Sequence, residues 1–140
     1  MFFALQPDYV RISMIARERP WEVDWIDISR CGTVPEWFIR QHANNLNWKA
    51  LSRRQALKEE FISKFAHEVS WNSVCSISKL SEAFMRDHIE HLVWPYVAHY
   101  QELSEAFMRD FADQLNWETV LKRQSLSDEF AIEMQMRGYL

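Results

Sequence analysis

A tryptophan returns every 23 residues through most of this chain, and no insertion or deletion interrupts the interval. The tryptophans of this column are Trp25, Trp48, Trp71, Trp94 and Trp117. Phenylalanines keep the same interval at Phe38, Phe61, Phe84, Phe107 and Phe130, and a third apolar column contains Leu46, Val69, Leu92 and Leu115. A unit this short cannot bury its own apolar face, so the regularity predicts stacked copies of one structural unit.

The composition favours a single all-α domain. The chain has 140 residues, enough for one continuous core but not for two independent ones. It contains only two glycines and four prolines, which leaves few positions for the tight turns of β-hairpins. Charged residues interrupt every apolar stretch, so we expect no transmembrane helix and a cytoplasmic location. The apolar Met1–Leu5 stretch lacks the basic flank and the length of a secretory signal.

Each full repeat is predicted to contain two helices. The first begins after a serine suited to cap a helix, and an acidic residue follows that serine and favours the positive end of the helix. These serines are Ser81, Ser104 and Ser127. From each phenylalanine, apolar side chains recur with helical periodicity for about two turns, which predicts one longer helix. A second, shorter helix is expected to begin at each tryptophan, and Pro95 fits only in the first turn of such a helix.

Short helices are marginal in water, so their stability has to come from packing between repeats. We therefore predict an α-solenoid of stacked short helical hairpins over residues 25–140, with residues 1–24 as an N-terminal capping segment. Within that segment, Asp8 can begin a helix that ends before Pro20. The alternation between Tyr9 and Ile15 also allows a short strand, although we favour the helix. The last helix is expected to run from Asp128 to about residue 137, before Gly138.

The repeat resembles a tandem helical repeat found in proteins of bacteriophages and large DNA viruses. Its typical unit reads LSEEFIREF, then a few polar residues, V-D-W and a short segment that ends in Q. The matching features are the LSEAF openings at 80–84 and 103–107, the tryptophans, and the closing glutamines Gln55, Gln101 and Gln124; Ser78 departs from this pattern. The resemblance implies a viral origin, and hence a location in the cytoplasm of the host cell, and a repeat scaffold; it supplies no catalytic residues. It also implies an inhibitor of a host defence protein, of the anti-CRISPR or anti-restriction type, because small phage proteins often act in this way.

The exposed columns are the predicted binding surface. The net charge is −4, and no basic stripe follows the chain, so direct nucleic-acid binding is not expected, although a nucleic-acid-binding helical repeat is the alternative. Residues of the second helix vary from repeat to repeat, which suits a protein partner, although solvated positions under no constraint would vary too. Exposed aromatic and long charged side chains dominate the energetics of protein interfaces. The predicted partner-binding residues are Arg53, Tyr96, His99 and Lys122.

Metal, cofactor and catalytic sites are not expected. His88 and His91 are three residues apart, but His88 shares a core column with Phe65 and Phe111, while the column of His91 reads as solvent-facing. Most serines are explained as helix caps, and two glycines are too few for a phosphate-binding loop. The chain is therefore predicted to be non-enzymatic, without metal or cofactor.

Two further expectations concern sulfur-containing side chains. Cys31 and Cys75 stand in different columns of the repeat and are predicted to be free, buried thiols in a reducing compartment. The protein is expected to be a monomer or a homodimer, and Met134 and Met136 are the residues that would cover one another in a dimer.

Overall fold

The structure is a computed structural model that describes residues 7–140, so the expectation for Met1–Leu5 lies outside the described residues. Residues 7–140 contain eleven α-helices, three short 3-10 helices and no strand, which confirms the all-α prediction. Successive helices pack along the chain in two compact units. Among the described residues, the first unit contains 7–55 and Phe65–Ser70, and the second contains Ala56–Lys64 and Trp71–Leu140. The division into a capping segment and one array stays a prediction.

The first unit contains four α-helices. They are α1 (Tyr9–Glu18), α2 (Trp25–Ser29), α3 (Glu36–His42) and α4 (Trp48–Arg54), with the 3-10 helix η1 (Pro20–Glu22) between α1 and α2. The Asp8 carboxylate accepts a hydrogen bond from the backbone N–H of Arg11 at 3.1 Å, and Pro20 ends the segment, so the helix predicted there is confirmed and the strand alternative is wrong. Helix α1 packs against α3, and α2 packs against α4.

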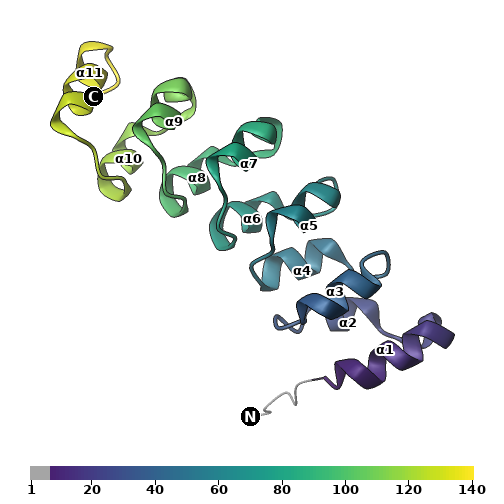
Figure 1. The fold of residues 1–140 in the computed structure, drawn as a ribbon. Helices are drawn as coiled ribbons and strands as arrows, with labels where there is room; N and C mark the ends of the chain where they lie inside the picture. The colour runs from purple at the N-terminus through teal and green to yellow at the C-terminus, as the bar shows by residue number, and fades with distance from the viewer. Residues whose placement is uncertain (1–6) are drawn as a thin grey trace, which may run out of the picture. The chain divides into compact units, whose positions relative to one another are not determined.

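The second unit contains seven α-helices in two rows (Figure 1). One row begins each helix at a tryptophan and contains α6 (Trp71–Ile77), α8 (Trp94–Tyr100) and α10 (Trp117–Arg123). The other row contains α5 (Glu59–Lys64), α7 (Glu82–Asp87), α9 (Glu105–Asp110) and α11 (Asp128–Met136). We call α2, α4, α6, α8 and α10 the Trp helices and α3, α5, α7, α9 and α11 the Phe helices. Helix α8 packs between α6 and α10.

Helices α7 and α9 are shorter than the sequence pattern predicted. Helix α7 ends at Asp87, and a separate 3-10 helix, η2 (Ile89–His91), follows a break at His88, where φ is −124° and ψ is 31°. Helix α9 is followed in the same way by η3 (Ala112–Gln114). The Trp117 indole N–H donates to the carbonyl of Ala112 at 3.0 Å, so the chain has to turn before the tryptophan. The prediction of one continuous longer helix is therefore wrong for α7 and α9, whereas α11 runs unbroken from Asp128 to Met136, which confirms the prediction for the last helix.

The predicted apolar columns form the core of both units. Every phenylalanine of the repeat is buried, and so are the side chains three residues after the tryptophans at Leu51, Val74, Val97 and Val120. The tryptophans differ more in their exposure to solvent: Trp48 is 2% exposed and Trp117 is 8% exposed, whereas Trp71 is half-buried. Each tryptophan ring packs on aromatic rings of the following Phe helix or of the turn after it. The closest pair is Trp48 with Phe65, whose ring centroids are 4.0 Å apart with an interplanar angle of 12°.

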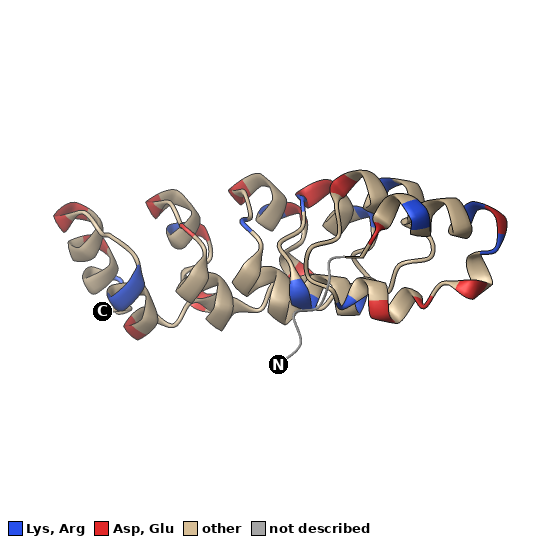
Figure 2. Ribbon diagram, turned by 90° about the horizontal axis from the view of Figure 1, so that it is seen from below, with Lys and Arg blue, Asp and Glu red and all other residues tan. Residues whose placement is uncertain are grey.

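Serine caps join successive repeats of the second unit. The Ser104 hydroxyl accepts a hydrogen bond from the backbone N–H of Phe107, which confirms the predicted cap. The Glu82 carboxylate of the preceding repeat accepts from the Ser104 backbone N–H at 2.6 Å and from its hydroxyl at 2.7 Å. The same bridge joins Glu59 to Ser81 and Glu105 to Ser127. Figure 2 shows acidic residues recurring on the helices of this unit. Glu82 and Glu105, which follow Ser81 and Ser104, therefore also bind the capping serine of the next Phe helix.

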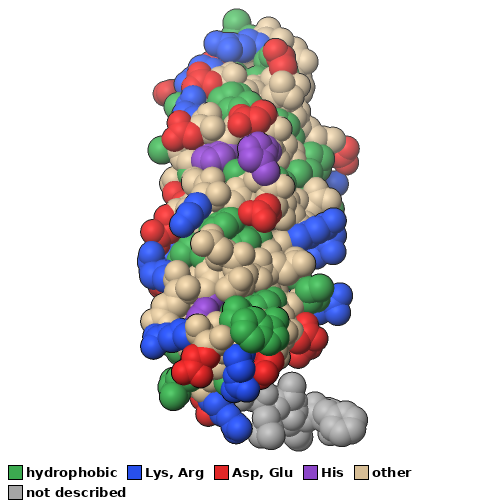
Figure 3. All heavy atoms as spheres, turned by 90° about the vertical axis from the view of Figure 1, so that its right-hand side faces the viewer, with side chains coloured by type: hydrophobic (Ala, Val, Ile, Leu, Met, Phe, Trp, Pro, Cys, Tyr) green, Lys and Arg blue, Asp and Glu red, His purple; other side chains and the backbone are tan. Residues whose placement is uncertain are grey.

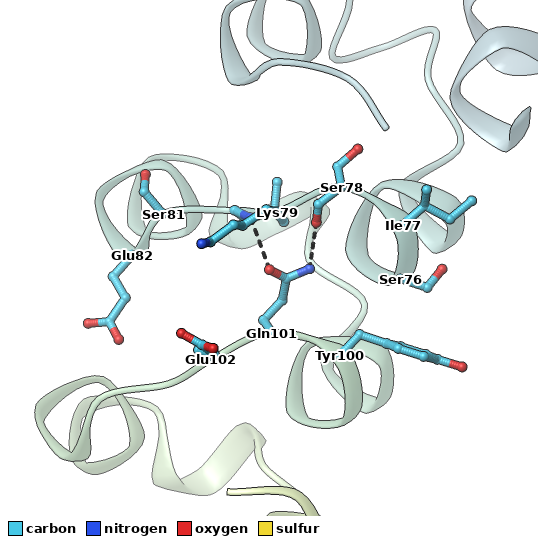
Figure 4. Close-up of a pocket in the computed structure, with 10 residues that line it drawn as sticks. Ser76, Ile77, Ser78, Lys79, Ser81, Glu82, Tyr100, Gln101 and Glu102 are labelled. Atoms are coloured by element: carbon cyan, nitrogen blue, oxygen red, sulfur yellow. Dashed lines mark hydrogen bonds between the residues drawn. The ribbon is translucent and has the colours of Figure 1, made fainter. Parts of the chain in front are cut away.

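The closing glutamines are structural. The Gln101 side-chain oxygen accepts from the backbone N–H of Leu80 at 2.9 Å, and its amide donates to the carbonyl of Ser78 (Figure 4). The same amide also donates to the carbonyl of Cys75. Gln124 makes the equivalent three hydrogen bonds one repeat later. Each glutamine thus fixes the loop of the preceding repeat against the end of its own Trp helix. At the departing position Ser78, the hydroxyl accepts one hydrogen bond, from the backbone N–H of Leu57.

Candidate partner-binding surfaces

The four predicted binding residues all lie on Trp helices and outside the core, but the structure does not bring all four together. Arg53 is on α4 in the first unit, whereas Tyr96 and His99 are on α8 and Lys122 is on α10 in the second unit. Tyr96 and His99 form one surface with a residue that the sequence analysis missed. Arg53 belongs to a different surface, of which the analysis identified only this residue.

The first surface is aromatic and lies on α8. The Tyr96 and Tyr100 side chains are 38% and 54% exposed, and their ring centroids are 6.2 Å apart in a stacked arrangement. The His99 ring meets the edge of Tyr100 at a centroid distance of 4.3 Å. We call Tyr96, His99 and Tyr100 the aromatic face. Tyr100 was not predicted as a binding residue. It is four residues after Tyr96, so the helical spacing is a signal that could have identified it.

A polar pocket of about 420 Å³ borders this face. Gln101 projects into it, and Tyr100 lies on the side of α8, while Ser81 and Glu82 line the side of α7 (Figure 4). The hydrogen bonds of Gln101 to the backbone form one wall of the pocket and hold it open between successive repeats. Its polar walls arise from the groups that join the repeats, so the pocket is a consequence of the stacking.

Lys122 is already paired. Its ammonium group lies 3.1 Å from the Glu118 carboxylate, one helical turn earlier on α10, and both side chains are largely exposed. An exposed pair of this kind contributes only about 0.3–0.5 kcal/mol. Lys122 is therefore held only weakly by Glu118 and does not touch the aromatic face in any described contact.

The second surface is a basic groove between α2 and α4. It has a volume of about 410 Å³, and seven residues line it. Four of them are cations: Arg30, Lys49, Arg53 and Arg54. No acidic residue lines the groove, and none of the four cations makes an ion pair with any residue in 7–140. The other lining residues are Ile26, Asn47 and Ala50.

The backbone around the basic groove is fixed at both ends. At one end, the Ser29 hydroxyl donates to the carbonyl of Trp25 and accepts from the backbone N–H of Asn47 at 2.9 Å. At the other end, Gln55 hydrogen-bonds to both the N–H and the carbonyl of Val34. Gly32 has a φ of +79°, and a β-carbon there would lie 3.5 Å from the Arg54 carbonyl, so the loop passes close to the end of α4.

The first unit also exposes an apolar surface between α1 and α3. Val10 and Met14 are well exposed on α1, and Trp37 is exposed on α3 beside them. Figure 3 shows one face of the molecule, on which hydrophobic side chains lie in the open among charged ones. Nothing on this surface identifies a ligand, because only one charged residue, Arg17, joins its lining.

The histidines have structural contacts. The ring nitrogens of His88 lie within hydrogen-bond distance of the Phe84 carbonyl and of the Ser63 hydroxyl. His91 stacks on Trp71 at a centroid distance of 4.8 Å, so the prediction that its column faces solvent is wrong at this position. His42 is buried, as predicted for the core column, and burial lowers the pKa of its imidazole, with a further lowering by Arg17. Its ring contacts the Ser13 hydroxyl at 2.8 Å.

The segment LSEAFMRD occurs identically at residues 80–87 and 103–110, and its arginines join successive repeats. Arg86 pairs with Asp110 at 2.8 Å, and Arg109 pairs with Glu133, which stands 23 residues after Asp110. Each guanidinium also lies 5.3 Å from the centroid of a phenylalanine ring in the next repeat. The hydrogen bond from Arg109 lowers the pKa of the Glu133 carboxyl. These charges are therefore contacts between repeats and are not free for a partner.

Three expectations about sulfur-containing residues have different outcomes. Cys75 is a free, buried thiol, and burial raises its pKa, whereas Cys31 is free but exposed, which corrects the prediction for that residue. Met134 is fully buried within its own chain. It cannot cover a second copy, so the proposed role of Met134 in a dimer is wrong, because it fills the core column of Phe65 and Phe111.

Comparisons with known proteins do not place the chain in a family. No family model matches it, and no curated protein or solved structure matches it significantly. The similarity to the viral repeat therefore stays a prediction. Within residues 7–140, no three His, Cys, Asp or Glu side chains are grouped so as to hold a metal ion. None of the helices in this range has both the length and the apolar character needed to cross a bilayer.

Proposed function

We propose that this chain is a non-enzymatic helical-repeat protein that binds a partner protein through the exposed side of its Trp helices. The observation that supports this most is the aromatic face, where two exposed tyrosines and a histidine are fixed on one short helix. Tyrosine is enriched among the residues that dominate interface energetics, because it buries a large rigid surface and retains a polar hydroxyl. We further propose that the unbroken 23-residue interval builds an α-solenoid.

The aromatic face is separate from the groups that hold the fold. On α8, Val97 and Ala98 are fully buried and provide the packing, while Tyr96 and Tyr100 point outward. No described hydrogen bond of either tyrosine joins it to a neighbouring repeat. The apolar surface of these two rings is exposed to water and does not stabilise a contact with another helix. A partner protein would remove this surface from water.

The partner that we propose is a host protein, and more narrowly a component of a bacterial defence system. This narrower proposal rests on the resemblance of the repeat to those of phage and large-virus proteins. A protein that acts by covering a surface needs a rigid scaffold and variable exposed positions. The buried columns and the differing Trp-helix surfaces are consistent with that requirement.

Affinity capture from a bacterial lysate tests the proposal when wild type is compared with Tyr96→Ala/Tyr100→Ala. We expect the wild type to retain a specific protein that the double variant loses by at least about tenfold, the loss typical of two interface anchors. Ile132→Ala, an exposed side chain on α11 in the same unit, is the matched control and should retain it. Equal capture by the wild type and the double variant would exclude the aromatic face as the binding surface.

A further inference from the structure

We propose that the basic groove between α2 and α4 binds an acidic, partly apolar peptide segment of a partner protein. The inference deepens the proposed function, on which it rests, by assigning a ligand chemistry to a second surface. Four cations converge on one groove without a single acidic residue in its lining. Guanidinium groups bind carboxylates through paired hydrogen bonds, so three arginines at one site favour aspartate and glutamate side chains.

The helix dipole explains the positions of two groove cations on α4 but not that of the third, Lys49. Arg53 and Arg54 are in the last turn of α4, where the helix dipole favours positive charge. Lys49 is in the first turn of the same helix, where the dipole disfavours it. In the Trp helices of the second unit, the residues that match Lys49 are Asn72, Pro95 and Glu118, none of which is a cation. A cation that opposes the dipole and has no ion-pair partner points to an anionic ligand.

The groove is prepared for binding by its backbone. The Ser29 hydroxyl fixes the end of α2 to the start of α4, and Gln55 fixes the following loop to the end of α4. Gly32 allows that loop to approach Arg54 closely. A ligand therefore meets a formed surface and orders only side chains, which limits the entropic cost of binding.

The lining favours a peptide over a nucleic acid. Ile26 is 50% exposed in the groove and offers a contact for an apolar side chain of a peptide. No aromatic side chain lines the groove, whereas single-stranded nucleic acids are bound by stacking bases on aromatic rings. The column of Arg30 and Arg53 continues as Ser76, His99 and Lys122, so two repeats without arginine or lysine interrupt it, and no continuous line of cations is left to follow a nucleic-acid backbone.

Fluorescence polarisation with three labelled probes tests the inference on the full chain. The first probe is a peptide of about twelve residues that alternates pairs of glutamates with leucine, a length that spans one groove. The second replaces every glutamate with glutamine, and the third is an oligothymidylate of about the same length, sufficient for one single-strand site. We expect the glutamate peptide to bind at least about tenfold more tightly than the other two, with an affinity that falls as salt is raised.

Two double variants with the same change in net charge separate the groove from general attraction. Arg30→Gln/Arg53→Gln removes two groove cations and should weaken the glutamate peptide by at least about fivefold. Arg11→Gln/Arg123→Gln removes two exposed arginines that do not line the groove and should leave the affinity within about twofold. Thermal melts establish that both variants are folded, and Lys49→Gln should give a smaller loss in the same direction.

Three results would overturn the inference. These are tighter binding of the oligothymidylate, equal weakening by the two double variants, and equal binding of the glutamate and glutamine peptides. The proposed function fails separately, since it is judged by the capture of a protein through Tyr96 and Tyr100. A chain that captures its partner through the aromatic face but ignores the glutamate peptide would keep the proposed function and lose this inference.

Discussion

The α2–α4 pair of the first unit and the α6–α8 pair of the second have the same repeat positions but different surfaces. Residues at matching positions, two repeats apart, are Arg30 and Ser76, Lys49 and Pro95, Arg53 and His99, and Arg54 and Tyr100. One surface is therefore a groove of unpaired cations, and the other is a stacked aromatic face. The packing side shows no such change: Ile28 matches Val74 and Leu51 matches Val97, and all four are buried. The comparison indicates that burial fixes one side of each Trp helix and leaves the residues of the other side free to vary.

The strongest way to break this comparison is to show that the two units are not held by the same packing. Trp48 in the first unit and Trp117 in the second are both buried, so Trp48→Ala and Trp117→Ala should each reduce the free energy of unfolding by about 3–5 kcal/mol. Urea denaturation measures both. A loss below about 1 kcal/mol in either variant, which is the range of ordinary substitutions, would mean that its tryptophan does not support the core.

The second test concerns the serine cap of the Phe helices, which α9 has and α3 lacks. Ser104 caps α9 and receives the Glu82 carboxylate, whereas Pro35 at the start of α3 makes no side-chain capping bond. Ser104→Ala should cost about 1 kcal/mol, within a range of about 0.5–2, because the helix loses its cap. Ser125→Ala, at an exposed serine in a loop of the same unit, is the control and should be nearly neutral. Equal losses in the two variants by urea denaturation would argue against the capping bridge.

The third test uses pH to distinguish the units. The pKa of His42 in the first unit lies below its ordinary value of 6.5, chiefly because the ring is desolvated. As pH falls through about 6.5, the unfolded chain binds the proton before the folded chain does, so stability falls with acidification. His42→Phe, which places the side chain of Phe65 and Phe111 in this column, should give a shallower fall in unfolding free energy between about pH 7 and pH 5. Identical slopes for wild type and variant would exclude this source of acid sensitivity.

The smallest expected effect is on stability at the two exposed surfaces. Arg30→Gln/Arg53→Gln and Tyr96→Ala/Tyr100→Ala should each change the free energy of unfolding by no more than about 0.5 kcal/mol, because these side chains make few contacts within the chain. Parallel urea melts check this. If either pair lowered stability by more than about 2 kcal/mol, well above the usual surface range, the affected surface would belong to the scaffold.

The core could be predicted from the sequence because a strict interval assigns the same environment to every residue in a column. The phenylalanine column and the serine caps were found in this way, and Pro95 correctly marked the start of α8. The break after α7 could not be found, since the residues there are apolar with helical spacing. At this break the Phe84 carbonyl lies 3.0 Å from a ring nitrogen of His88, and one repeat later the Ala112 carbonyl accepts from the Trp117 indole.

The binding surfaces were predicted less completely. Tyr96 and His99 were identified from their exposed columns, but Tyr100 was not, although it completes the aromatic face. Arg53 was identified without Arg30, which stands in the same column, and without Lys49 and Arg54, because only the fold shows that residues of two helices line one groove. Whether a charged residue is paired also depends on the fold: Lys122 meets Glu118, and the duplicated arginines meet acids of the next repeat.

The most direct test of a common framework with exchangeable surfaces is the free energy of unfolding of Arg30→Ser/Arg53→His/Arg54→Tyr. These substitutions give the first unit the residues that stand two repeats later in the second. We predict that the triple variant folds and that its free energy of unfolding, measured in urea, stays within about 1 kcal/mol of the wild type, as expected for exposed positions. A loss of about 3 kcal/mol or more, the size expected for a buried side chain, would show that the outer side of the Trp helices helps to hold the fold and would contradict the account.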